Sequence, residues 1–219
     1  MKPTILKKDI KHINLRVKPS CEVVMSVPIK TTDKHIEYVL NKRSDWIKSK
    51  LAFYRSKPIV IAQEYVSGEN CRFLGRNYRL KVVQSSEESV KLKGGYLNLL
   101  VKDKDNFKRK EYLVKRWYFE KAETHIKKAF DKYQPIVNKE VKSVRIRKMK
   151  TRWGSCNPVK SYINLNSELI KFPTQCIEYV VFHELTHLIY PNHDKNFYNY
   201  LSLHMSNWKK IKQVLETGY

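Results

Sequence analysis

The segment His183-Glu184-Leu185-Thr186-His187 constrains this chain more than any other feature of its sequence. On a helix, residues four apart lie on one face about 5–6 Å from each other, so two imidazoles at this spacing can hold one metal ion. Glu184 lies one position off that face, where its carboxylate can reach a water molecule more readily than the ion. A helical pattern of apolar residues surrounds the segment: Ile177, Val180, Val181, Leu185 and Leu188.

His193 is the candidate for a third metal ligand. It follows His187 by six residues, just after Pro191 and Asn192. Proline disfavours a continuing helix, so the chain can turn back toward the metal at this point. Asp194 then suits the N-terminus of the next helix. Three protein ligands and an open fourth position are typical of catalytic zinc, which predicts one Zn²⁺ per chain bound by His183, His187 and His193, with Glu184 as general base in a hydrolytic reaction.

The rest of the sequence predicts an α+β fold. Residues 10–101 read mainly as short strands, with one helix starting at Thr31 or Thr32 and running to about Tyr54, and with hairpins over residues 65–101. The composition changes near residue 103. We therefore expect a β-rich N-terminal subdomain with one helix over residues 1–103 and a catalytic subdomain over residues 104–219.

The second half of the chain reads mainly as helices. Five segments carry the prediction: a helix from about residue 105 to 133 that Pro135 ends, strands at 141–149 and 162–166, a helix from about 173 to 190, and a last helix from about 194 to 215. Residues 152–156 read as a turn or an edge strand around Gly154.

These motifs resemble a known family, the YgjP-like zinc metallopeptidases, which are similar to the Wss1-type (WLM) and SprT-type proteases. The resemblance rests on the segments Ser44-Asp45-Trp46-Ile47, Leu74-Gly75-Arg76-Asn77-Tyr78, Thr151-Arg152-Trp153-Gly154-Ser155-Cys156, Tyr162-Ile163-Asn164-Leu165-Asn166, His183-Glu184-Leu185-Thr186-His187 and Asn192-His193-Asp194, and extends from about residue 10 to about residue 210. It implies a zincin-like catalytic domain with three histidine ligands, a glutamate base and a protein or peptide substrate. It implies no particular substrate.

Other residues near these motifs have two interpretations. Arg152 and Trp153 form a substrate-facing wall of the zinc cleft in the functional interpretation, whereas Trp153 is a packing residue in the structural one. Cys156 is more simply a structural thiol than a metal ligand. A tetrahedral intermediate can accept a hydrogen bond from several nearby side chains, and the sequence does not choose among them: Tyr190, Tyr198, Tyr200 and His204.

The charge of the chain bears on its partners and location. Lys and Arg total 44 against 21 Asp and Glu, a formal net charge of +23 that predicts attraction to polyanions such as nucleic acid. The excess is spread along the whole chain, as a solvated basic surface would be. Four cysteines without a disulfide pattern, and the lack of a signal-peptide or membrane-spanning pattern, predict a cytoplasmic protein without a membrane partner.

Three functions are therefore compared. The leading one is a zinc metallopeptidase that acts near nucleic acid. A zinc-dependent phosphoester or nucleotide hydrolase suits the basic surface, but the sequence has no second carboxylate cluster for a two-metal site. A nucleic-acid-binding module with a structural zinc is the third, although structural sites usually have four protein ligands.

Overall fold

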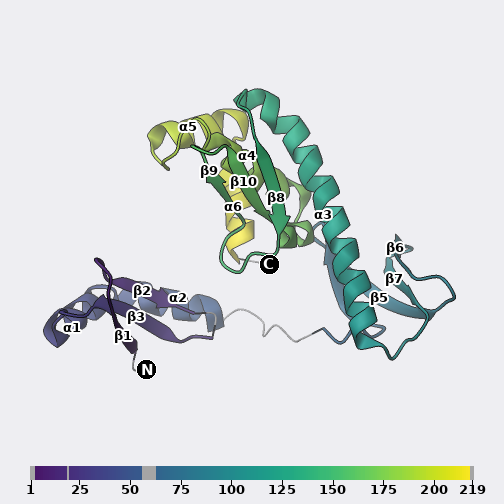
Figure 1. Cartoon of the computed structure of the whole chain (residues 1–219), viewed down its shortest axis with the longest axis horizontal. Coiled ribbons are helices and arrows are strands. Elements are labelled where there is room, and N and C mark those ends of the chain that lie inside the picture. The colour runs from purple at the N-terminus through teal and green to yellow at the C-terminus, as the bar shows by residue number, and fades with distance from the viewer. Residues whose placement is uncertain (1–2, 19, 56–62, 218–219) are drawn as a thin grey trace. The chain divides into compact units, whose positions relative to one another are not determined.

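The computed structural model describes residues 3–18, 20–55 and 63–217, which form an α+β structure (Figure 1). Its described residues fall into two compact units, one up to Arg55 and one from Gln63 onward, and each is considered by itself. This division differs from the predicted boundary at residues 103/104 because the strands after Gln63 pack against the helix that follows them. The two subdomains 1–103 and 104–219, whose outermost residues lie outside the described ones, stay a prediction.

The first unit contains a three-stranded sheet in the order β1-β3-β2. Its strands are β1 (Thr4–Lys8), β2 (Asn14–Val17) and β3 (Val23–Pro28). The central strand β3 is parallel to β1 and antiparallel to β2, and Val23–Val27 are buried because both edges of β3 are covered. The sequence predicted β2 and β3, whereas β1 was missed.

Two helices follow in this unit, α1 (Asp33–Lys42) and α2 (Ser44–Arg55), where the sequence predicted one. Thr32 caps α1, as expected, and its side chain accepts a hydrogen bond from the backbone N–H of His35. The helix breaks at Arg43, whose backbone leaves the helical region at φ −103° and ψ 8°. Ile36 is the buried residue of α1 and packs against Met25 and Val27 of β3.

The second unit begins with a four-stranded sheet in the order β4-β5-β7-β6. Its strands are β4 (Asn70–Phe73), β5 (Arg76–Gln84), β6 (Ser89–Lys93) and β7 (Tyr96–Val101). The predicted hairpins β4–β5 and β6–β7 are present. The sequence did not predict that β7 lies parallel to β5, which leaves β6 at the edge of the sheet.

The long helix α3 (Phe107–Val137) is shared by two hydrophobic cores (Figure 1). Leu113, Val114 and Trp117 pack against the four-stranded sheet. The second half of α3, from Ala122 to Val137, belongs to a larger core. The predicted end at Pro135 is wrong. The helix continues to Val137, because this buried residue adds contacts to the core. Asn138, in the left-handed conformation, is the C-terminal cap.

The larger core covers a second sheet, which has the order β8-β10-β9. Its strands are β8 (Ser143–Arg147), β9 (Gly154–Asn157) and β10 (Tyr162–Asn166), and a 3₁₀ helix, η1 (Ser167–Lys171), follows. β10 is parallel to β8 and antiparallel to β9, so β9 forms an edge of this sheet, as predicted for residues 152–156.

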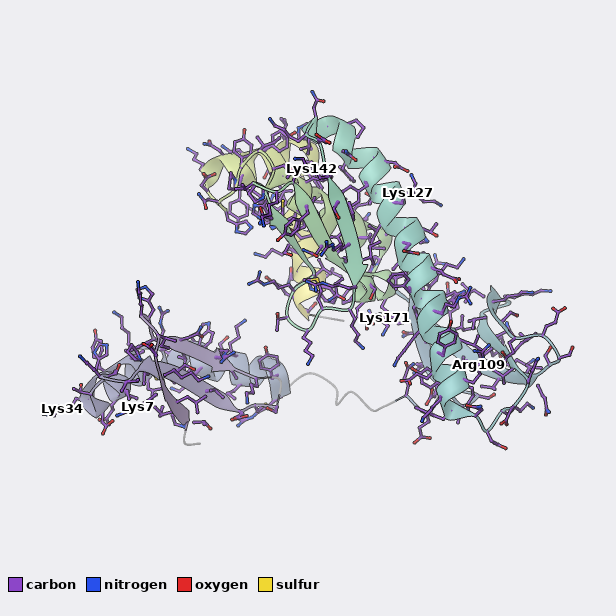
Figure 2. The ribbon with its side chains drawn as sticks, viewed as in Figure 1. Lys7, Lys34, Arg109, Lys127, Lys142 and Lys171 are labelled. Carbon is purple, nitrogen blue, oxygen red and sulfur yellow. The ribbon has the colours of Figure 1, made fainter. Side chains whose placement is uncertain are left out.

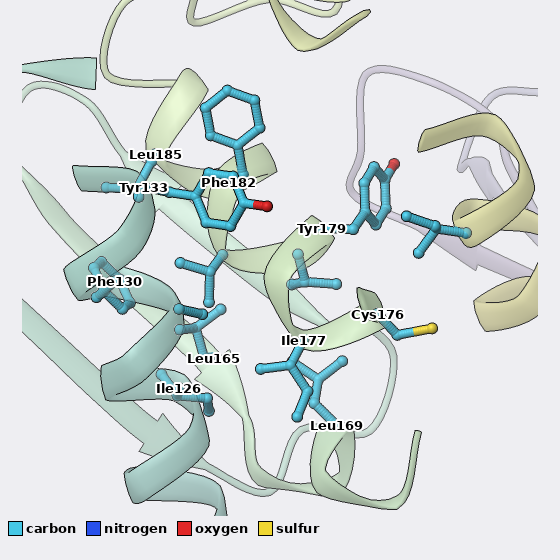
Figure 3. Packing of buried hydrophobic residues seen from close by; sticks show 14 of the residues in the cluster. Ile126, Phe130, Tyr133, Leu165, Leu169, Cys176, Ile177, Tyr179, Phe182 and Leu185 are labelled. Carbon is cyan, nitrogen blue, oxygen red and sulfur yellow. The ribbon is translucent and has the colours of Figure 1, made fainter. Parts of the chain in front are cut away.

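The helix α4 (Thr174–Thr186) lies at the centre of this core. It contacts α3, α5 (Lys195–His204), α6 (Trp208–Thr217) and the sheet, which explains why it is apolar on nearly every side. Figure 3 shows Ile177, Phe182 and Leu185 of α4 among side chains of α3 and β10. The predicted last helix is two helices, because the chain leaves the helical region at Met205.

Among the helices of the described residues, none combines the length and the apolar character that crossing a bilayer requires.

Candidate metal and catalytic site

The structure brings together the three histidines that the sequence singled out. One ring nitrogen from each of His183, His187 and His193 lies within 4.8 Å of the others. The Nε2 atoms of His183 and His193 are 2.9 Å apart. These three side chains are the only group of metal-binding residues of this kind found among the described residues.

The local chain path explains this convergence. Helix α4 ends at Thr186 rather than near Tyr190, but His187 keeps helical geometry at the C-terminal cap, so it stays on the same face as His183. The chain then turns back. Asp194 caps α5, its carboxylate accepting a hydrogen bond from the backbone N–H of Phe197 at 3.0 Å. This cap fixes the residue just before it, His193, beside the end of α4.

Backbone contacts also orient the rings. Nδ1 of His187 lies 3.2 Å from the carbonyl oxygen of Tyr190, to which it can donate a hydrogen bond. That bond selects the tautomer whose Nε2 lone pair is available to a metal ion. Nδ1 of His183 is buried without a hydrogen-bond partner in the described part of the chain, and its Nε2 faces His193.

Phe197 forms an apolar support for all three imidazoles. Its side chain is fully buried, and its ring centroid lies 4.9, 4.7 and 4.8 Å from those of His183, His187 and His193. One side chain of α5 thus contacts every member of the group. We infer that it limits the rotation of the three rings.

The surroundings of His183 and His187 favour the neutral form of these two side chains. Burial lowers the pKa of His183 to about 3, and the neighbouring His187 and His193 add to this effect. Burial also lowers the pKa of His187. Neutral imidazole is the form that binds metal, so burial favours the metal-binding form of these two side chains.

The residues fit a tetrahedral metal ion. Zinc–nitrogen bonds of about 2.0–2.1 Å place two tetrahedral ligand atoms roughly 3.3 Å apart. The nitrogens in this structure lie from 2.9 Å to at most 4.8 Å apart, close to that separation. His193 is exposed, so the group of three imidazoles reaches the protein surface on that side.

Glu184 lies beside this group, pressed against strand β9. It is only 6% exposed. Burial raises the pKa of its carboxyl to about 8, while the positive charge of Arg152 lowers it. An ideal Cβ atom built on Gly154 would lie within 3 Å of three atoms of the Glu184 side chain, so the backbone of β9 is in direct contact with it.

The loop before β9 is held by Asn166. Its side-chain amide donates to the carbonyl oxygens of Met149 and Arg152, both at 2.9 Å, and its side-chain oxygen accepts from the backbone N–H of Met149 at 3.2 Å. The backbone N–H of Asn166 also donates to the carbonyl of Trp153. Asn166 therefore fixes the segment that carries Arg152 and Trp153 toward the site.

The structure gives Arg152 and Trp153 different environments. Arg152 is exposed and close enough to Glu184 to affect its pKa. Trp153 packs edge-on against Phe172, with ring centroids 4.8 Å apart, and also borders a cavity next to Glu184. The packing and functional interpretations of Trp153 are thus compatible.

The other candidates from the sequence lie differently. His204 packs against Phe182 and Tyr200, and the Tyr200 hydroxyl donates to the carbonyl of Ile136. Tyr198 is the tyrosine that stacks on a site histidine, His193. Cys156 does not join the group of possible ligands, and burial raises the pKa of its thiol to about 12.

Sequence reasoning missed two features of the site. Tyr179 precedes His183 by four residues and contacts its ring, and this spacing alone could have identified it. Trp208 stacks with both Tyr179 and Tyr198 and thereby links α4 to α5. The spacing of Phe197, Leu201, His204 and Trp208 predicts only that Trp208 packs in the core. It does not predict the stacking with Tyr179, because Tyr179 is distant in sequence.

Comparisons with known proteins identify the family of this chain. Two solved structures are similar to parts of the chain: the metallopeptidase zymogen jannalysin of Methanocaldococcus jannaschii (22% identity, TM-score 0.37, 41% of this chain and 86% of that chain) and the metallopeptidase zymogen abylysin of Pyrococcus abyssi (22%, 0.36, 44% and 93%). No curated protein matches. A family model described as the YgjP-like metallopeptidase domain matches residues 11–217, and on that match this chain belongs to the YgjP-like metallopeptidase family.

Proposed function

We propose that the protein is a zinc-dependent peptidase in which His183, His187 and His193 hold one Zn²⁺ and Glu184 is the general base. The observation that carries this proposal is the convergence of three imidazoles beside a buried carboxylate. Three imidazoles with an open fourth position suit zinc better than magnesium or calcium, which prefer oxygen ligands.

The chain's own residues divide the chemistry. A bound zinc ion supplies a Lewis acid that polarises the scissile carbonyl and lowers the pKa of a water molecule to about 7. In its ionised form Glu184 accepts a proton from the attacking water, and a pKa raised to about 8 lets its carboxyl hold that proton and deliver it to the leaving amine. Gly154 leaves room for this carboxylate, and Arg152 is placed to stabilise negative charge near it.

Strand β9 suits the recognition of an extended peptide. It lies at the edge of its sheet, paired with β10 among the described strands, and its first residue contacts the proposed base. An extended substrate can add to such an edge by backbone hydrogen bonds, which recognise a peptide with little regard to its side chains. This arrangement supports a protein or peptide substrate.

Association with nucleic acid is a separate proposal. It rests on the net charge of +23, and the basic side chains labelled in Figure 2 come from both units of the chain. Non-specific binding to duplex DNA should weaken steeply with salt, with a log–log slope of about −0.9 for each neutralised phosphate. Absence of binding at low salt would remove this proposal and leave the peptidase proposal intact. A cytoplasmic location likewise stays a prediction.

The two alternatives from the sequence gain no support. Among the described residues, no second group of acidic side chains lies near the histidines to hold another metal ion, as two-metal phosphoester hydrolysis requires. A purely structural zinc does not explain a buried carboxylate next to an open ligand position.

Metal analysis together with peptide hydrolysis tests the proposed function. Protein purified without a metal-affinity tag should contain about one zinc per chain, and His187→Ala should lose it. His204→Ala is the matched control, because His204 lies outside the group of possible ligands, and it should keep the metal. Glu184→Gln should also keep the metal but lower kcat by about 10²–10⁴-fold. Full activity in Glu184→Gln, or no zinc in the wild type, would contradict the proposal.

A further inference from the structure

A cavity of about 200 Å³ opens next to the proposed catalytic residues. His183, Glu184 and Gly154 are among the residues that line it. Four further lining residues are apolar or aromatic and come from three parts of the fold: Trp153, Tyr179, Val180 and Leu215. Figure 3 shows Tyr179 projecting from α4 away from Ile126 and Phe130 of α3, on the side where α6 packs.

The size of this cavity suits one side chain. Sites for whole small-molecule ligands usually measure about 300–1,000 Å³, which is more than this cavity provides. A pocket of this size with apolar walls gains affinity by removing an apolar side chain from water. Its direct contact with Glu184 and His183 places the occupant next to the bond that would be cleaved.

The charges around the cavity favour a neutral occupant. Lys212 and Glu216 of α6 line it and form an ion pair at 3.7 Å, so their charges largely offset each other. An acidic side chain inside would lie beside the buried carboxylate of Glu184, at the cost of burying a second acid there. The walls offer an apolar side chain no such penalty.

We propose that this cavity is a substrate subsite that accepts one apolar side chain of about the size of leucine or phenylalanine, and that Leu215 of α6 sets its depth. This proposal rests on the peptidase function proposed above. It assigns to the last helix a role in substrate selection, in addition to its packing against α4. Leu215 is 5% exposed and lies where a larger side chain would occupy the cavity.

The test uses the full-length, zinc-loaded protein and peptides that differ at a single residue, Ala, Leu, Phe or Asp, next to the cleaved bond. For the wild type we expect kcat/KM to be about tenfold or more higher for Leu or Phe than for Ala or Asp. Leu215→Phe should shift the preference toward Ala, and Leu215→Ala should shift it toward Phe. Val214→Ala, on the same helix but outside the cavity lining, is the control and should keep the wild-type order.

A second measurement tests the subsite by binding alone, without cleavage of a substrate. Calorimetric titration of zinc-loaded Glu184→Gln with hydroxamates that carry the same four side chains should give the same ranking of affinities. If Leu215→Phe does not fold, Trp153→Leu replaces another lining residue by a smaller one and should increase the relative rate for Phe. Cleavage with the same side-chain order in wild type and both Leu215 variants would overturn the subsite alone. Absence of both zinc and cleavage in the wild type would overturn the peptidase function and the subsite together.

Discussion

Gly154 and Glu184 are in such close contact that a Cβ atom at residue 154 would lie 2.6 Å from Oε1 and 2.7 Å from Cγ of the glutamate. The edge strand of the sheet and the central helix therefore meet at the proposed general base. Any side chain at residue 154 would overlap with Glu184 and must displace its carboxylate. Because Glu184 is buried, that displacement is costly. This contact makes the glycine a requirement for the position of Glu184.

Gly154→Ala should lower kcat without removing the metal. Displacement of the general base should lower kcat by up to the whole contribution of general base catalysis, about 10²–10⁴-fold. The three atoms nearest to the added methyl group all belong to Glu184 and none to a histidine, so we expect the metal to stay bound. Peptide hydrolysis and zinc content should be measured on the same preparation. Ser155→Ala, the next residue of β9, is the control and should retain activity. Loss of zinc in Gly154→Ala would show instead that the strand supports the metal ligands.

Asn166→Asp should loosen the segment that precedes β9. The substitution removes the amide that donates to the carbonyls of Met149 and Arg152 and places a carboxylate oxygen against them. We expect a loss of roughly 1–3 kcal/mol in the free energy of unfolding, since Asn166 is 4% exposed and its partners are left unsatisfied. Urea unfolding measures this loss.

Asn164→Asp is the comparison for that variant. Asn164 is similarly buried on the same strand, but its amide donates to the hydroxyl of Ser155 at 3.2 Å and not to the loop. Both variants should be less stable, and Asn166→Asp alone should make the loop before β9 more sensitive to proteolysis. Equal proteolysis of both variants would argue against a specific clamp by Asn166.

Cys156 should be a poor nucleophile in the folded protein. Burial, and to a smaller extent the charge of Glu184, raise the pKa of its thiol to about 12. A free cysteine ionises near pH ~8.5, so at pH 8 its thiolate is present in the unfolded chain and nearly absent in the native one. Alkylation by iodoacetamide, followed by mass spectrometry, should be much slower at Cys156 in native protein than in denatured protein.

The same shift predicts a dependence of stability on pH. A raised pKa means that the native state holds the thiol proton more tightly, so this contribution is complete below the pKa of the unfolded thiol and is lost as pH rises toward 12. Cys156→Ala should therefore flatten the fall in stability above about pH 9. Rapid alkylation of native Cys156 at pH 8, or a loss of zinc in Cys156→Ala, would contradict the assignment as a structural thiol.

The sequence predicted the convergence of the three histidines better than it predicted the bounds of the helices and the pairing of the strands, for a physical reason. His183, Glu184 and His187 are placed by the period of one helix, and Pro191 predicts the turn that returns His193. These relations are local, so a short segment of sequence contains them. The cavity wall from Leu215 and the stacking of Trp208 depend on how α6 packs against α4, and no local pattern reports that packing.

Errors in the helix boundaries have a similar origin. Pro135 was expected to end α3, but burial of Val137 outweighs the hydrogen bond that proline removes. The apolar period runs through Arg43 and through Met205, although the backbone breaks at both residues. The parallel pairing of β5 with β7 was missed because it joins strands that are not consecutive in the chain.

Phe197 offers the most direct test of how the histidines are positioned. Truncation of a fully buried phenylalanine to alanine typically costs about 3–5 kcal/mol in stability, whatever its neighbours are. Phe197 and Phe182 are both fully buried, but Phe197 contacts all three histidines of the site, whereas Phe182 contacts Tyr133, Tyr200 and His204. Phe197→Leu and Phe182→Leu should therefore destabilise the protein to a similar extent, and only Phe197→Leu should weaken zinc binding. Competition with a chelator of known affinity measures that difference in folded protein, and equal zinc affinities in the two variants would show that the histidines are held by the backbone alone.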